Sequence, residues 1–191
     1  MKTKRYSDVY ETDSFSVTGS FTGSDEWPKS NPVQTDVVLE CRNSAHVLWN
    51  KKFGDLVMPD GAWNGFKLIV GAQDKVFTAI SNRLIEIDMT TGNTKWEVET
   101  GNTPIAFLLM SGSQIIVQNG YFNFQHDEGA NLASYDFQGR EKWRCILEGN
   151  DAFANSPRID RDGKLFASTW SSYDCEIDKL TGEILARKFT K

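Results

Sequence analysis

The stretch LIEIDMTTGNTKWEVETG, residues 84–101, decides the fold of this chain. It starts with residues that alternate along an expected strand, reverses at Thr91-Gly92, and opens a second strand at Trp96. Alternation with β-branched residues suits a pleated, half-buried strand, and glycine adopts the positive φ that a tight reversal needs. Asp88 can accept hydrogen bonds from the backbone N–H groups of the turn. The stretch therefore predicts a β-hairpin whose second strand carries a large ring for packing between sheets.

Three further stretches carry the same pattern. Residues 132–149, LASYDFQGREKWRCILEG, repeat it with one turn residue fewer. Near the C-terminus, YDCEIDKLTGEILARKF keeps the aspartate, threonine and glycine and has Ala186 at the tryptophan position. Near the N-terminus, VVLECRNSAHVLWNKKFG has Cys41 at the aspartate position. The residues that define the repeat are Trp49, Asp88, Gly92, Trp96, Asp136, Gly139, Trp143, Asp178 and Gly182.

The spacing of these stretches predicts the architecture. Their equivalent positions are 49, 96, 143 and 186, so the separations are 47, 47 and 43 residues. A period in the forties with β patterning is typical of propellers, in which each repeat forms one four-stranded blade. A helical solenoid is disfavoured because no helical period occurs along the chain. We therefore expect an all-β fold, a small β-propeller of about four four-stranded blades, with residues 1–191 forming a single domain.

The pattern D-x-x-T-G-x-x-x-W resembles the repeat of the quinoprotein-dehydrogenase propellers, known as the PQQ-like repeat. The resemblance covers most of the chain and is strongest at 84–101 and 132–149. It implies a propeller fold, whereas an activity does not follow from it, because one fold hosts many functions. By family analogy alone, a quinone- or metal-dependent oxidoreductase fragment is one alternative.

Two of the expected blades carry long insertions between their second and third strands. The first blade has one at 19–36 and the third has one at 119–131. Such loops share one face of a propeller, and in a closed ring of four blades they rise on opposite sides of the axis. Long loops on rigid scaffolds are disproportionately functional. The other expected strands are 7–11 and 14–18 in the first blade, 66–70 and 75–80 in the second, 105–110 and 114–118 in the third, and 155–159 and 164–169 in the fourth.

The two insertions contain the candidate partner-binding residues. Aromatic side chains supply binding energy at low cost in entropy, and neighbouring carboxylates such as Asp25 and Glu26 suit a basic partner. The alternative is that the rings fold over the top of their own blade as core. The predicted partner-binding residues are Trp27, Tyr121, Phe122, Phe124, His126, Asp127 and Glu128.

Charge and cysteine content exclude several classes of protein. The chain has 21 Lys and Arg residues against 26 Asp and Glu, a net charge of −5, which argues against a nucleic-acid-binding surface. No stretch approaches the roughly 20 apolar residues of a membrane helix, so no membrane association is expected. Cys41, Cys145 and Cys175 are an odd number at spacings that fit no zinc site, and they indicate reduced thiols in a cytoplasmic protein.

No catalytic or metal-binding constellation is visible. His46 and His126, the only histidines, are 80 positions apart, and neither has a second ligand at metal-binding spacing. The segment 160–163, Asp-Arg-Asp-Gly, lacks the rest of a calcium loop and predicts a hairpin turn instead. We therefore expect neither an enzyme nor a bound quinone, other cofactor or structural metal.

The function predicted from these features is non-enzymatic protein binding. A short acidic chain with unusual loops suits a cytosolic inhibitor or immunity-type protein that binds and neutralises a basic bacterial toxin. Besides the oxidoreductase fragment, the alternative is a propeller that binds a carbohydrate or another small ligand in its axial channel. Trp63 and Trp170 are the residues that support this second alternative, although both also fit a core role.

Overall fold

Antiparallel strands make up all the regular structure that is described. The computed structural model describes residues 3–24, 33–44, 46–58, 67–72, 74–120, 131–149 and 151–190, and within them it contains strands and no helix. It follows that no helix of the described residues could cross a membrane. The strands form four sheets of four, each built from strands that are consecutive in the chain and pair in order. This is the blade of a β-propeller, and the predicted all-β fold with four four-stranded blades is confirmed.

The blades follow one another along the chain. Blade 1 contains β1 (Thr3–Glu11), β2 (Ser16–Ser24), β3 (Val33–Asn43) and β4 (His46–Met58). Blade 2 contains β5 (Ile69–Ala72), β6 (Lys75–Ile80), β7 (Arg83–Asp88) and β8 (Thr94–Glu99). Blade 3 contains β9 (Ile105–Ser111), β10 (Gln114–Asn119), β11 (Leu132–Asp136) and β12 (Glu141–Cys145). Blade 4 contains β13 (Arg158–Ile159), β14 (Leu165–Ser168), β15 (Tyr173–Ile177) and β16 (Ile184–Phe189).

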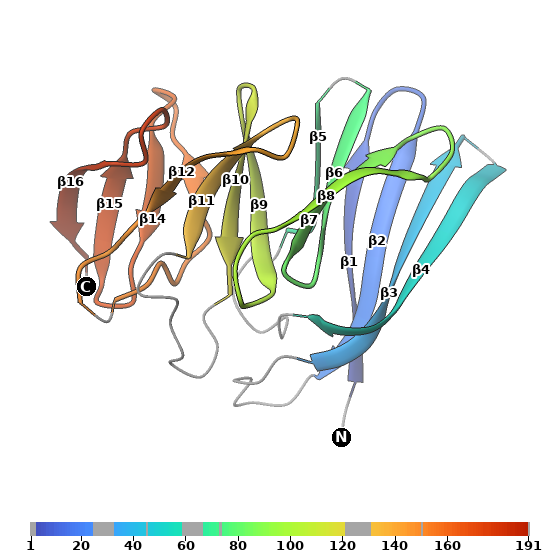
Figure 1. Cartoon of the computed structure of the whole chain (residues 1–191), viewed down its shortest axis with the longest axis horizontal. Coiled ribbons are helices and arrows are strands. Elements are labelled where there is room, and N and C mark those ends of the chain that lie inside the picture. The colour runs from blue at the N-terminus through green and yellow to red at the C-terminus, as the bar shows by residue number, and fades with distance from the viewer. Residues whose placement is uncertain are drawn as a thin grey trace.

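The four blades stand in an open row. Figure 1 shows them side by side in chain order, with blade 1 at one end of the long axis and blade 4 at the other. Blade 1 contacts blade 2 where β1 and β2 meet β5 and where β4 meets β6. Blade 2 contacts blade 3 where β5 and β6 meet β9. Within the described residues blades 1 and 4 lie at opposite ends of the row, so the closed ring of four blades, in which the two insertions would flank an axis, does not form in this chain.

The hydrophobic core lies between the sheets. One buried cluster extends from blade 1 through blade 2 into blade 3, with Phe77 and Tyr135 among its largest members. A second cluster joins blade 3 to blade 4 around Trp143 and Phe153. A single sheet cannot cover both of its own faces, so stacking of neighbouring blades supplies the apolar burial that stabilises the fold.

The repeat tryptophans bind each blade to the next. Every ring comes from the fourth strand of one blade and lies against the turn glycine of the following blade, where an added Cβ would come within 2.6–2.8 Å of the ring. Every indole N–H donates to the carbonyl of the residue after the repeat aspartate, at 2.7–3.2 Å. We call this arrangement the tryptophan clamp. Its three examples are Trp49 on Gly92 and the Met89 carbonyl, Trp96 on Gly139 and the Phe137 carbonyl, and Trp143 on Gly182 and the Lys179 carbonyl.

The depth of the clamp differs along the row. The sequence predicts that these rings pack between sheets, and they do so to different depths. Trp143 is 6% exposed, whereas Trp49 and Trp96 are only partly buried. Ala186 takes the equivalent register position in blade 4, opposite Glu176.

The repeat aspartates hold the turns that the clamp contacts. The Asp88 carboxylate accepts the backbone N–H groups of Thr91 at 2.9 Å and Thr90 at 3.0 Å. The hydrogen bond from the Thr91 backbone, which favours the charged form, lowers the pKa of the Asp88 carboxyl. Asp136 and Asp178 accept turn N–H groups in the same way.

Blade 1 differs most from the sequence prediction. The segment 19–36 was expected to be an insertion, but β2 continues to Ser24 and β3 begins at Val33. Gly19 and Gly23 lie within β2, where a Cβ on Gly23 would come 2.8 Å from the Tyr6 ring. These glycines permit a close approach by a neighbouring side chain, which is one established use of glycine in a strand. In blade 4 the difference is the opposite, because β13 is shorter than the expected 155–159.

The three cysteines are free thiols, as predicted, and all are buried. Burial raises the pKa of the Cys145 thiol to about 12, so this group stays protonated at neutral pH.

Candidate functional site

The predicted partner-binding residues lie outside the described residues. Trp27 falls in 25–32, and the other six, Tyr121, Phe122, Phe124, His126, Asp127 and Glu128, fall in 121–130. The structure does place the strand ends that flank these two segments. Strands β2 and β10 are each the second strand of their blade, and both run to the same edge of the row, the lower edge in Figure 1. We call it the insertion edge. In the sequence, 25–32 follows β2 and 121–130 follows β10.

Asn131 joins the two ends of the 121–130 segment to the linker between blades 3 and 4. Its Nδ2 donates to the carbonyls of Asn119 at 3.1 Å and Phe153 at 2.9 Å. Its Oδ1 accepts the Phe153 backbone N–H at 3.0 Å. The Asn119 N–H donates back to the Asn131 carbonyl at 2.9 Å. One asparagine thus closes the insertion at its base and fixes it to blade 4.

Asn119 fixes the same base to the linker between blades 2 and 3. Its side chain is 3% exposed, and its Nδ2 donates to the Thr103 carbonyl at 2.6 Å and to Thr100 Oγ1 at 3.0 Å. Its Oδ1 is a buried acceptor without a hydrogen bond within the described part of the chain. The Gly120 N–H donates to the Pro104 carbonyl at 2.7 Å. Because polar groups at this depth are costly to leave unpaired, the base is held in one arrangement.

Sequence reasoning missed an aromatic cluster on blade 4. Tyr173 and Phe189 pair across β15 and β16 with ring centroids 5.5 Å apart, and they are 39% and 57% exposed. Trp170, which the sequence left between a ligand-binding role and a core role, is 49% exposed in the turn before β15. The backbone N–H of Trp170 donates to the carbonyl of Ala152, the neighbour of Phe153, at 2.8 Å. The cluster therefore lies close to the base of the insertion. Its only signal in the sequence was an aromatic residue at one end of each strand, Tyr173 at the start of β15 and Phe189 at the end of β16.

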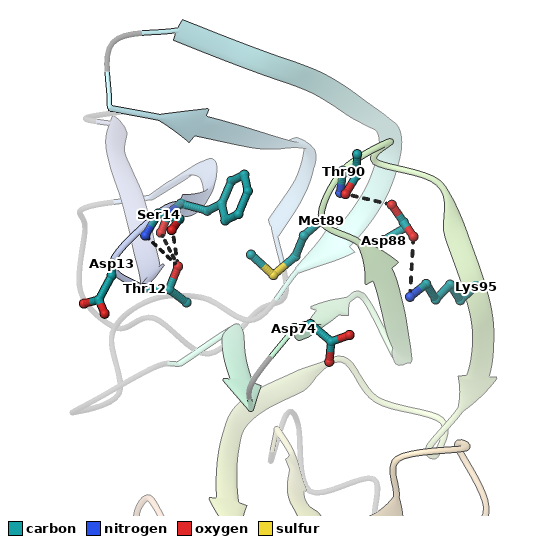
Figure 2. Close-up of a pocket in the computed structure, with 9 residues that line it drawn as sticks. Thr12, Asp13, Ser14, Asp74, Asp88, Met89, Thr90 and Lys95 are labelled. Atoms are coloured by element: carbon teal, nitrogen blue, oxygen red, sulfur yellow. Dashed lines mark hydrogen bonds and ion pairs between the residues drawn. The ribbon is translucent and has the colours of Figure 1, made fainter.

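A pocket of about 410 Å³ lies at the opposite edge, between the turns of blades 1 and 2 (Figure 2). Asp88 is tied to Lys95 there, with Oδ2 and Nζ 3.4 Å apart, and the Met89 side chain lies between Asp88 and the turn of blade 1. No group of three or more His, Cys, Asp or Glu side chains that could hold a metal ion occurs among the described residues. The lining residues are Thr12, Asp13, Ser14, Phe15, Asp74, Asp88, Met89, Thr90 and Lys95.

Comparisons with known proteins support the propeller assignment. Residues 102–189 match the family model of a domain of unknown function, DUF7957. The crystal structure of BamB from Moraxella catarrhalis is similar over 99% of this chain and 50% of that chain, at 17% identity and a TM-score of 0.60. The Pan2 WD40 domain of Neurospora crassa is similar over 95% and 48%, at 12% identity and a TM-score of 0.54. The chain thus spans about half the length of these two proteins.

A quinohemoprotein alcohol dehydrogenase from Pseudomonas putida HK5 is similar over 91% of this chain and 33% of that chain, at 16% identity and a TM-score of 0.57. No curated protein matches the sequence. At these identities the likeness concerns the fold. The chain is a propeller that resembles the PQQ-like type, as the repeat predicted, and also the WD40 type.

Replacing Asn131 by alanine is expected to lower the free energy of unfolding by about 1–3 kcal/mol, because buried groups of Asn119 and Phe153 lose their partners. Urea denaturation measures the loss, and hydrogen exchange at the Phe153 amide is expected to become faster. The matched control is Asn50→Ala, whose side chain makes one exposed contact at 3.5 Å and should cost about 0.5 kcal/mol or less. Equal losses in the two variants would show that the base is not fixed by Asn131.

Proposed function

We propose that this protein is a non-enzymatic binding module that captures another protein at the insertion edge. The propeller fold is consistent with a protein-binding propeller. The observation that carries the proposal is the hydrogen-bonded base around Asn131, which holds both ends of the 121–130 segment on the scaffold. A loop held at its base loses less entropy on binding than a free one, so its affinity for a partner is higher.

The composition of this edge supports a protein as the partner. Trp170, Tyr173 and Phe189 lie beside the base and are each more than a third exposed. In the sequence, the segment between β10 and β11 also contains Tyr121, Phe122 and Phe124. Large rings of this kind are enriched at the centres of protein interfaces, where a few of them carry most of the binding energy.

The charge supports a basic partner. The chain carries a net charge of −5, and the insertions contribute Asp25, Glu26, Asp127 and Glu128. Carboxylates at the rim of an interface accelerate association with a basic protein, while the rings slow its release. We extend the proposal to a cytoplasmic inhibitor of the immunity type, which neutralises a basic bacterial toxin by covering its active surface.

The double variant Phe122→Ala, Phe124→Ala tests the binding role. The tagged wild-type chain is cross-linked in host cells, and the partner recovered with it is then measured against both proteins by titration calorimetry. We expect at least a tenfold loss of affinity, on the order of 1–2 kcal/mol per ring, with the melting temperature unchanged. The matched control is Val47→Ala, Leu48→Ala, which removes two exposed apolar side chains at the opposite edge and should bind as the wild type does.

Three outcomes would contradict the proposal. Unfolding of the double variant would identify the two rings as core. Unchanged binding would place the partner on another surface. A recovered small ligand in place of a protein would favour the ligand-binding alternative, and turnover of that ligand the oxidoreductase one. For the immunity role, producing the recovered partner alone should arrest growth, and co-producing the wild-type chain should restore it; a harmless partner would overturn that role.

A further inference from the structure

The two ends of the row each present one sheet face that no blade of this chain covers. Strand register identifies the equivalent positions on these faces. In blade 2, one row across the sheet is Phe77, Glu86 and Trp96, and it faces blade 3, because the Phe77 and Trp96 rings meet there with Phe137 and Gly139. In blade 4 the same row is Phe166, Glu176 and Ala186, which therefore lies on the outer face.

The outer face of blade 4 is polar at most of the positions where the inner face of blade 2 is apolar, although Phe166 keeps the aromatic ring of Phe77. The neighbouring row of blade 2 is Ala79, Leu84 and Val98, and the first strand contributes Val70. At the same register positions blade 4 has Ser168, Asp174, Lys188 and Arg158. Trp96 corresponds to Ala186. Four of these five positions thus carry a polar residue in blade 4, and the fifth carries an alanine in place of the tryptophan.

The charges of this outer face are satisfied within the face itself. Arg158 donates to both carboxylate oxygens of Asp174, at 3.0 and 2.5 Å, and its guanidinium lies 5.1 Å from the centre of the Phe166 ring. Ser168 donates to Asp174 at 3.0 Å. Lys164 pairs with Glu176 at 2.8 Å. A second molecule docking here would have to desolvate these ion pairs, and the cost of that desolvation can exceed the Coulombic gain.

The outer face of blade 1, at the other end, also carries paired polar side chains, beside the exposed Val9, which lies in register with Thr18 and Glu40. Arg5 donates to Ser20 at 2.9 Å, and Glu40 accepts from Arg42 at 2.6 Å and from Asn50 at 3.5 Å. Along β3, Glu40 and Arg42 alternate with Leu39 and Cys41, which are buried against blade 2.

Both halves of the tryptophan clamp are absent where a fourth clamp would form. Blade 4 has Ala186 in place of the tryptophan. The β3–β4 turn of blade 1 runs from Asn43 to His46, without the aspartate, threonine and glycine that receive the ring in the other blades.

We infer that both outer faces are solvent-facing caps, so that the chain stands as an open row of four blades and does not join a second copy into a closed ring. Stacked repeats need terminal units with a polar outer face to stay soluble, and blades 1 and 4 meet that requirement. The inference rests on the residues of the two faces and is independent of the proposed binding role.

Sedimentation equilibrium of the 191-residue chain tests the inference. The expected mass is 21.6 kDa at every concentration measured. A mass that rises toward twice this value with concentration, together with loss of the dimer on substituting Arg158 or Asp174, would overturn it.

A second variant tests whether the polar residues are responsible. Asp174→Leu, Ala186→Trp, Lys188→Val restores three residues of the blade 2 face and is expected to self-associate. The matched control introduces the same three residue types at scattered exposed sites, as Glu99→Leu, Glu148→Trp, Lys142→Val, and should remain monomeric. A folded first variant that stays monomeric would contradict the cap role; if that variant does not fold, the mass of the wild-type chain alone decides.

Discussion

Replacing Trp143 by alanine is expected to lower the free energy of unfolding by about 3–5 kcal/mol, the usual range for a large buried aromatic side chain. The ring is 6% exposed in the cluster that joins blades 3 and 4. Its indole N–H donates to the Lys179 carbonyl at 2.8 Å. The substitution therefore removes apolar packing and a hydrogen bond from the contact that attaches the last blade.

Urea denaturation followed by circular dichroism measures this loss. Trp170→Ala is the matched control, because it deletes the same side chain from a site that is 49% exposed and should cost about 1 kcal/mol or less. If the two variants lose the same amount, the clamp does not stabilise the row.

Replacing Gly182 by alanine is expected to cost about 2–5 kcal/mol. Gly182 has a φ of +76°, and an alanine there pays roughly 1–2 kcal/mol for the left-handed conformation. Its Cβ would also stand 2.6 Å from the Trp143 ring, and displacing a packed ring adds about 1–3 kcal/mol.

Gly112 offers the matched control. Its φ is +60°, but nothing lies within 4 Å of the position of an added Cβ, so Gly112→Ala carries the backbone cost alone. In a Trp143→Ala background, the cost of Gly182→Ala should fall to that of Gly112→Ala, because the ring that it displaces is gone. An unchanged cost in that background would show that Gly182 acts through its backbone only.

The clamp residues could be predicted from the sequence because the hairpins of blades 2 and 3 each contain both a turn that receives a ring and a tryptophan that enters the next turn. Asp88, Gly92 and Trp96 are all within nine residues, so their spacing is visible without knowing the fold. Blade 1 was harder to predict, because Gly19 and Gly23 are typical of turns when read locally. Their place in β2 depends on Ile69 and Tyr6, which reach them from other strands.

The candidate site could be predicted only in part for the same reason. The position of the insertion in the third blade followed from the repeat, and β10 and β11 do flank it. The base around Asn131 could not be predicted, since it joins the end of β10 at Asn119 to Thr103 in the linker before β9 and to Phe153 in the linker before β13. Two departures from the repeat pattern indicated the two end blades of the row: Ala186 stands at the tryptophan position of blade 4, and Cys41 stands at the aspartate position of blade 1.

The open row also has a thermodynamic consequence for ligand binding. In a linear array each unit exchanges free energy only with its neighbours, so a terminal unit has one stabilising interface and frays more readily than an inner one. Blade 4 is such a unit, and the segment from Ala152 to Phe153 that receives Asn131 also accepts the Trp170 N–H. A protein that grips both the 121–130 segment and Trp170 spans this last interface. Binding of such a protein would therefore stabilise the contact between blades 3 and 4, so that partner binding and the folding of blade 4 are linked equilibria.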